Sequence, residues 1–409
     1  MLVQGLLQPP ARAFIWSAFL CFALNGKPTS KGPPSFEHKE LTAPPPKSLN
    51  RQILRRSEAA PAWRLQFPPK PEIPKTDGEP LKSRLCCSHT APQVLPPLQK
   101  RLDEFRQQGR VQAGSLIISV FGDAIMPRGS RIWLGSLIRL LEPLELNERL
   151  IRTSVFRLAK EEWLRSEPSG RRTDYLLTPA GQRRFEEASR HIYASTAPQW
   201  DRRWRLIIAA GELTAKQRDA LRRALFWQGF GSLGGDCFVH PSADLRAAFD
   251  ALIAEGLAEV LGKLKPLMAA DAQLGGAASD IEMVHGAWNL ERLAGVYSEF
   301  VDRYQPVLDQ LRDGQDQIDD ESTFLLRILL IHDYRRLLLR DPELPDVLLS
   351  ADWPGQQARV LCKELYRRLL APSERHLDSH LQLASGQTPE AAPFLLERFR
   401  EADPLAQVA

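Results

Sequence analysis

Cationic side chains recur along one side of the segment from 147 to 163, in a spacing that suits contact with DNA bases. At 100° per residue, a helix here places its basic residues opposite its apolar ones. A guanidinium can bind guanine through two hydrogen bonds, and threonine or phenylalanine can contact the thymine methyl group. A lysine at the far end would more naturally meet a phosphate. The candidate DNA contacts on this helix are Arg149, Arg152, Thr153, Arg157 and Lys160, with Phe156 beside them.

The opposite side of the same helix is expected to face the core. Asn147 precedes the segment and is a plausible N-cap, because its side-chain oxygen can accept a hydrogen bond from a free backbone N–H. The residues on this side are Ile151, Val155, Leu158 and Glu162, with Ala159 nearby.

A solvated charged helix is the alternative interpretation of the segment. Its charges could pair along the helix at a spacing of four residues, as Glu148 with Arg152 and Arg157 with Glu161. In that case the cations would serve solubility alone.

A short hairpin follows the helix directly. Strand-like segments Leu164–Glu167 and Asp174–Leu177 flank the turn Pro168–Gly170, and the tip carries Arg171 and Arg172. Such a tip can reach DNA beside the helix, or it can be a turn kept soluble by two charges. Next to a basic helix, the first interpretation is favoured.

The surrounding elements are those expected of a winged helix-turn-helix domain over residues 96–196. A proline at the first helical position supports the last of its helices. The predicted helices are Leu98–Gln108, Ser115–Phe121, Trp133–Leu141, Asn147–Trp163 and Thr178–Tyr193, with the first two separated by Gly109 and Gly114.

A second unit is predicted over 197–275, in the order strand-helix-strand-strand-helix-strand. This is the order of a ferredoxin-like, split βαβ domain. Its predicted elements are Trp204–Ala209, Thr214–Trp227, a hairpin over Gly229–Val239, Ala243–Glu255 and Ala258–Leu267. Small metal-dependent nucleases use such a fold, but Glu212 is the only carboxylate near the end of the first strand, so we expect no metal site.

An all-helical unit is predicted over 276–384, after Gly275-Gly276, with an irregular tail over 385–409. Its clearest helices are Trp288–Asp302, Thr323–Leu339 and Gln356–Leu370.

The helix Thr323–Leu339 is apolar on most sides and carries a cationic cluster. One interpretation pairs the cations as structural salt bridges with Asp333, Glu343, Asp346 or Asp352. The other has them line a pocket for an anionic ligand between aromatic walls. The residues concerned are His332, Tyr334, Arg335, Arg336 and Trp353, with Arg340 a turn further on.

The first 95 residues differ in composition from the rest. They hold 15 of the 32 prolines, and 13 Lys and Arg against 6 Asp and Glu. We interpret residues 1–95 as a disordered extension, which a start codon assigned too far upstream would explain. The remaining 314 residues hold 41 basic and 44 acidic side chains, so any nucleic-acid surface must be local.

The apolar run from Phe14 to Leu24 is too short to span a bilayer, and we expect no membrane partner. The five cysteines show no paired metal-binding spacing, which favours a cytoplasmic protein.

Longer stretches resemble one family, the phenylacetic acid catabolism (PaaX) repressors, from about Leu98 to Leu370. In order along the chain, the stretches are SLIISVFGD, RGSRIWLGSLIRLLEPLELNERLIRTSVFRLAKEEWL, GRRTDYLLTPAGQRR, WQGFGSL and LLIHDYRRLLLRDPELPDVLLSADWPGQQARVLCKELYRRL.

This resemblance implies an α+β fold with the three units above, and a cytoplasmic, homodimeric repressor without cofactor or enzymatic activity. It implies binding to an inverted repeat before phenylacetate degradation genes, and release by phenylacetyl-CoA or a related aryl-CoA. Arg149, Arg152, Thr153 and Arg157 would match the family's recognition helix, and Arg171 and Arg172 its wing. A metal-dependent nuclease or a protein-interaction adaptor are the alternatives.

Overall fold

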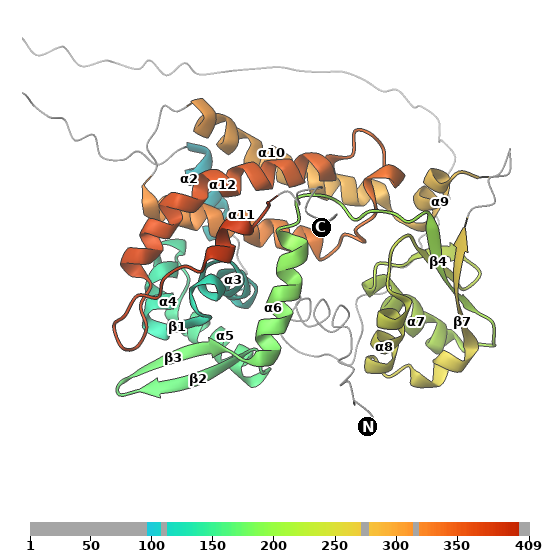
Figure 1. Cartoon of the computed structure of the whole chain (residues 1–409), viewed down its shortest axis with the longest axis horizontal. Coiled ribbons are helices and arrows are strands. Elements are labelled where there is room, and N and C mark those ends of the chain that lie inside the picture. The colour runs from blue at the N-terminus through green and yellow to red at the C-terminus, as the bar shows by residue number, and fades with distance from the viewer. Residues whose placement is uncertain (1–95, 108–112, 271–277, 314–318, 401–409) are drawn as a thin grey trace, which may run out of the picture. The chain divides into compact units, whose positions relative to one another are not determined.

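The computed structural model describes residues 96–107, 113–270, 278–313 and 319–400 (Figure 1). The predicted extension over 1–95, Gly109, the Gly275-Gly276 break and the last residues of the tail lie outside these ranges. Within the described ranges, no helix has the length and apolar character needed to cross a bilayer.

The described residues between 96 and 192 contain five α-helices. Local signals set the starts of two of them: the Asn147 side chain accepts a hydrogen bond from the Arg149 backbone N–H, and Pro179 occupies a first-turn position. Both predictions are confirmed. The helices are α2 (Pro96–Arg106), α3 (Ala113–Val120), α4 (Leu134–Leu141), α5 (Glu148–Lys160) and α6 (Pro179–Ile192), and α3 continues into a π-turn (Phe121–Ile125) and a 3-10 turn (Met126–Arg128).

A three-stranded antiparallel sheet accompanies these helices, in the order β1-β3-β2. Its strands are β1 (Arg131–Trp133), β2 (Leu164–Ser169) and β3 (Arg172–Leu177). The prediction that Trp133 opens a helix is wrong, because its backbone pairs with Asp174 in the sheet. The predicted turn is also wrong, because Ser169 pairs with Arg172 and only Gly170 and Arg171 connect the strands.

Helix α5 ends earlier than predicted, at Lys160. Glu162 has a left-handed φ of 60° and is exposed, so its assignment to the apolar side is wrong. The chain leaves the helix here so that the side chain of Trp163 can enter the core, where it is 1% exposed.

The central unit has the predicted order of elements and its own core. Its four antiparallel strands are arranged β5-β6-β4-β7, and its core includes Ile207, Leu225 and Phe238. The elements are β4 (Arg203–Ala209), α7 (Ala215–Trp227), β5 (Gly231–Gly234), β6 (Cys237–His240), α8 (Leu245–Ala254), a 3-10 helix (Ala258–Lys263) and β7 (Leu264–Ala270). The last strand therefore begins later than predicted, after that 3-10 helix.

The third part is helical, as predicted, with longer helices than periodicity indicated. It comprises α9 (Asp280–Ala287), α10 (Leu290–Asp313), α11 (Asp320–Leu338), a 3-10 turn (Asp346–Leu348), α12 (Pro354–His380) and a 3-10 turn (Pro393–Glu397). Helix α11 packs against α10 and α12 and, on another side, against α3. The described part of the tail is packed against the core, because Phe399 is fully buried against Tyr193 and Tyr366.

A buried ionic network joins the first part to the last. Asp123, in the π-turn after α3, pairs with Arg327 of α11 at 2.8 Å and with Arg398 of the tail at 2.9 Å. The hydroxyl groups of Tyr193 and Tyr366 also donate to its carboxylate. Buried charges need such partners, and the network therefore requires all these segments to be in place together.

Candidate nucleic-acid interface

Helix α5 is held by its apolar side. Ile151, Val155 and Leu158 are at most 2% exposed, and the helix packs against α3. This side is therefore fixed in the core, and the remaining circumference of the helix faces solvent.

The solvent side of α5 carries the predicted basic residues. Arg149, Arg152, Thr153 and Lys160 are exposed, and Arg157 is half-buried. The Thr153 hydroxyl donates to the Arg149 carbonyl oxygen at 2.7 Å, so its methyl group is left to meet a partner. The prediction that this basic side points outward is confirmed.

Phe156 lies among these cations and is 66% exposed. Single exposed apolar side chains are common on protein surfaces, so exposure alone assigns Phe156 no role. In this position its ring is accessible to a thymine methyl group.

Arg152 forms an ion pair with Glu148, as the alternative interpretation predicts. The shortest distance is 2.5 Å, and both side chains are more than half exposed. Exposed pairs of this kind contribute about 0–1 kcal/mol. A phosphate or a guanine can therefore replace Glu148 as the partner of Arg152 at small cost.

The hairpin separates its two arginines. Gly170 has a φ of 60°, which suits the first central position of a two-residue turn, and Arg171 completes the tip. Arg172 begins β3, and its guanidinium lies 4.3 Å from the ring of Trp133, which Arg139 also approaches at 5.1 Å. The tip thus presents Arg171, while Arg172 is already held by an aromatic ring.

Asp174 holds the middle of the hairpin. Its carboxylate is 1% exposed and accepts hydrogen bonds from Arg131 Nε and from the Ala384 backbone N–H, both at 2.7 Å. Arg131 also pairs with Glu167 of β2 at 3.1 Å. Charge-assisted bonds of this kind give the hairpin a defined direction.

Comparison with known proteins finds three family models that match this chain. Family models match residues 112–181 (PaaX-like protein), 197–263 (PaaX protein central Cas2-like domain) and 288–379 (PaaX-like protein C-terminal domain). The transcriptional repressor PaaX of Escherichia coli (strain K12) is 34% identical over 306 residues, covering 73% of this chain and 95% of that protein. The chain belongs to the PaaX family. A solved structure, the uncharacterized protein Rv0674 from Mycobacterium tuberculosis, is similar at 23% identity and a TM-score of 0.41, over 64% of this chain and 98% of that one.

In this member of the PaaX family, the cationic cluster of α11 is turned inward. His332 and Arg335 are each 3% exposed, and both contact the Ser119 hydroxyl of α3 at 3.1 Å. Arg335 also donates to the Ser115 hydroxyl at 2.6 Å. The cavity beside Arg335 measures about 10 Å³, which is room for one water at most.

Burial shapes the charge of this cluster. It lowers the pKa of Arg335 to about 9, with help from Arg336, so Arg335 remains charged at neutral pH. It also lowers the pKa of His332 well below its ordinary range, again with help from the two arginines. His332 is therefore neutral in the folded protein.

The other members of the cluster are also packed. Tyr334 and Trp353 are 2% and 8% exposed, and Trp353 meets Tyr297 edge-on at 6.0 Å. Arg336 is half-buried. These positions show interior packing, as the structural interpretation expects.

The acidic partners predicted for these cations are mostly engaged elsewhere. Asp333 pairs with Arg101 at 2.7 Å, Glu343 with His191 at 2.8 Å and Asp346 with Arg359 at 3.3 Å. The predicted partners for Arg335 are therefore wrong, because its guanidinium meets hydroxyl and carbonyl groups of α3 instead.

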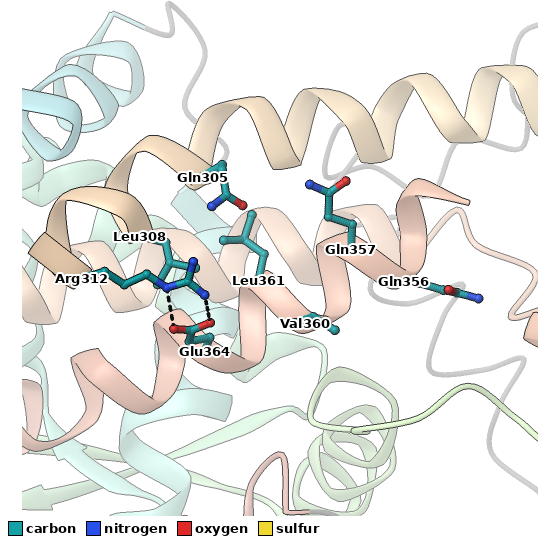
Figure 2. A pocket seen from close by; sticks show the side chains of 8 residues that line it. All are labelled: Gln305, Leu308, Arg312, Gln356, Gln357, Val360, Leu361 and Glu364. Carbon is teal, nitrogen blue, oxygen red and sulfur yellow. Dashed lines mark hydrogen bonds and ion pairs between the residues drawn. The ribbon is translucent and has the colours of Figure 1, made fainter. Parts of the chain in front are cut away.

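Two of the hollows on the surface of the described residues lie away from this cluster. The first, of about 280 Å³, runs between α10 and α12, and Figure 2 shows Arg312 bound by Glu364 through two hydrogen bonds at its edge. The second, of about 900 Å³, is lined by Trp200 and Arg202 but also by Asp280 and Asp346. Neither hollow offers the surplus of positive charge that several phosphates require.

The position after the first central strand shows no gathering of ligands. Glu212 is exposed in the loop before α7. Among the described residues, no three His, Cys, Asp or Glu side chains lie close enough together to hold a metal ion.

Proposed function

We propose that the chain is a transcriptional repressor whose residues 96–196 form a winged helix-turn-helix DNA-binding domain. Helices α4 and α5 would be the helix-turn-helix, and β2 and β3 the wing. The observation that carries this proposal is the outward basic side of α5, next to a hairpin whose tip is Arg171. Membership of the PaaX family and 34% identity to a named repressor support it.

Each candidate residue has a role in this proposal. Arg149 and Arg152 hydrogen-bond base edges in the major groove, and Thr153 contacts a thymine methyl group. Arg157, Lys160 and Arg171 meet phosphates or the neighbouring groove. Arg172 stabilises the wing through its contact with the Trp133 ring and adds positive charge beside the DNA backbone.

The proposed operator is an inverted repeat before phenylacetate degradation genes, bound by a homodimer in the cytoplasm. A dimer with twofold symmetry places its two recognition helices about 34–36 Å apart, or a multiple of that. The central unit (197–275) would link the DNA-binding domain to a helical effector and dimerisation domain (276–384), followed by the tail from 385.

The proposed effector is phenylacetyl-CoA or a related aryl-CoA, and no cofactor is required. If the effector binds at His332, Tyr334, Arg335, Arg336 and Trp353, α11 must first part from α3, because the cavity beside Arg335 is too small. Since α3 also packs against α5, that movement would disturb the recognition helix. Effector and DNA would then favour different conformations, and each would weaken binding of the other.

A mobility-shift titration on the DNA immediately upstream of the chain's own gene tests the proposal. We expect a specific protein–DNA complex that dissociates when phenylacetyl-CoA is added. Its affinity should fall steeply as the salt concentration rises, because phosphate binding releases counterions. An adaptor would show no salt-dependent shift. A nuclease would cleave the duplex when magnesium is added and stop with a chelator.

A further inference from the structure

The segment that follows α12, residues 381–384, lies beside Trp133 of β1 and Asp174 of β3. Strand β1 is at the edge of its sheet, and the Trp133 backbone N–H donates to the Gln382 carbonyl oxygen at 3.0 Å. Two residues further, the Ala384 backbone N–H donates to the buried carboxylate of Asp174 at 2.7 Å. The segment is thus attached to both β1 and β3.

The same segment is attached to α4 through the side chains of Ser136 and Arg139. The Ser136 hydroxyl, which is fully buried, donates to the His380 carbonyl oxygen and accepts from the Gln382 backbone N–H, both at 2.9 Å. Arg139 of α4 donates to the Gln382 side chain at 3.0 Å. A single serine therefore uses both its donor and its acceptor capacity to fix this segment.

Apolar anchors hold the segment in place. Leu381 is fully buried in the main core and Ala384 is 8% exposed. Beyond it, the tail returns to the same part of the chain, where Arg128 donates to the Pro389 carbonyl oxygen at 2.9 Å and the Ala392 N–H donates to the Pro127 carbonyl oxygen at 2.7 Å. The segment is consequently a fixed support for β1 and α4.

We propose that residues 381–384 are a positioning element that sets the direction of the hairpin relative to α4 for specific DNA binding. This inference depends on the proposed function. The hairpin projects Arg171, while α5, which follows α4 in the chain, carries the proposed base contacts. A change in the angle between them moves the two sets of contacts out of register on one duplex, while each set can still meet phosphates singly.

Ser136→Ala tests the proposal in the full-length chain. It removes the two hydrogen bonds of the Ser136 hydroxyl, to His380 and Gln382, and leaves the apolar packing of Leu137 and Leu140 intact. Fluorescence anisotropy would measure affinity for the upstream duplex and for a scrambled duplex of the same length and composition. We expect the ratio of the two affinities to fall about three- to tenfold, the range that the loss of one or two net hydrogen bonds produces.

A matched control comes from the same tail. The Ser195 hydroxyl donates to the Arg400 carbonyl oxygen at 3.2 Å, away from the hairpin, so Ser195→Ala should leave the ratio unchanged. Gln382→Ala removes the contact from Arg139 alone and should lower the ratio less than Ser136→Ala. It also serves if Ser136→Ala does not fold.

Hydrogen exchange at the Trp133 and Ala384 amides reports directly on the segment. We expect both amides to exchange faster in Ser136→Ala while the Tm changes little. Faster exchange with an unchanged affinity ratio, or a ratio that falls only in step with Tm, would show that the segment is merely structural. A wild-type chain that fails to distinguish the two duplexes would instead overturn the proposed function itself.

Discussion

Arginine side chains in this chain divide by exposure into two groups with different physical roles. Arg149, Arg152 and Arg171 lie on the surface, where a new partner can be taken at small cost. Arg327 and Arg335 are buried, with partners in the protein's own core. The residue type alone does not distinguish the two groups, whereas burial identifies the structural links.

Arg171→Ala tests the tip of the hairpin. If Arg171 meets a phosphate, the variant should weaken binding to all duplexes alike and reduce the slope of log affinity against log salt by about 1. Anisotropy titrations at several salt concentrations measure that slope. A loss confined to one base position would show base recognition instead.

The lowered pKa values of His332 and His376 predict that the folded state loses stability in acid. Burial lowers the pKa of His376 to about 4, with help from His380, and burial lowers that of His332 well below its ordinary 6.5. The unfolded chain therefore binds more protons, and the free energy of unfolding should decrease as pH falls from about 6.5 towards 4.

Urea unfolding at a series of pH values measures this decrease. His332→Asn should make the decline shallower, by at most about 1.4 kcal/mol per pH unit. His285→Asn, at an exposed position, should leave the slope as it is. Equal slopes in all three proteins would show that the burial of His332 plays no part.

The helices and strands determine where these side chains point. Local sequence signals predicted the starts of several of these helices. Asn147, Pro179 and Thr214 start their helices as the sequence predicted, because capping depends on neighbours within three or four residues. The outward basic side of α5 was predictable for the same reason, since helical periodicity alone determines it.

Contacts between distant segments were not predictable from the sequence. Trp133 was expected in a helix, and its place beside Arg172 depends on the pairing of β1 with β3. Arg335 was paired with nearby carboxylates, whereas its partners are Ser115 and Ser119, more than 200 residues away. Likewise, no local sequence pattern indicates that the tail contacts Asp123 and Asp174.

Asn147→Ala tests the cap that starts α5. We expect a loss of stability of about 0.5–2 kcal/mol, together with weaker specific DNA binding because the first turn carries Arg149. Thr214→Ala is the matched control, because it removes the capping box of α7 in the central unit. It should cost similar stability and leave DNA binding unchanged. Parallel losses of binding in both variants would contradict the placement of the interface on α5.

Among the described residues, the network around Asp123 joins the first part of the chain to the helical part, through α11, α12, Tyr193 after α6 and the tail. Such a network gives these two parts a shared free energy, which is what coupling between two ligands requires. It is also costly to break, because removing one partner leaves a buried charge with fewer compensating bonds.

Arg398→Met tests whether the network around Asp123 joins the two parts. Its guanidinium donates to both Asp123 and the Tyr366 hydroxyl, so we expect a loss of about 3–5 kcal/mol in the free energy of unfolding. Arg400→Ala is the control, because Arg400 is largely exposed and its pair with Glu397 is 3.7 Å long. If both variants lose less than about 1 kcal/mol, the range of an exposed pair, the network does not join the two parts.

The double variant Arg149→Ala, Arg152→Ala tests the central claim most directly. Its control is Arg375→Ala, whose exposed pair with Asp320 resembles that of Arg152 with Glu148. The measurement is the ratio of affinities for the upstream duplex and its scrambled counterpart. We predict that the double variant loses about 1–3 kcal/mol of discrimination per arginine and the control none. Full discrimination by the double variant would contradict the account.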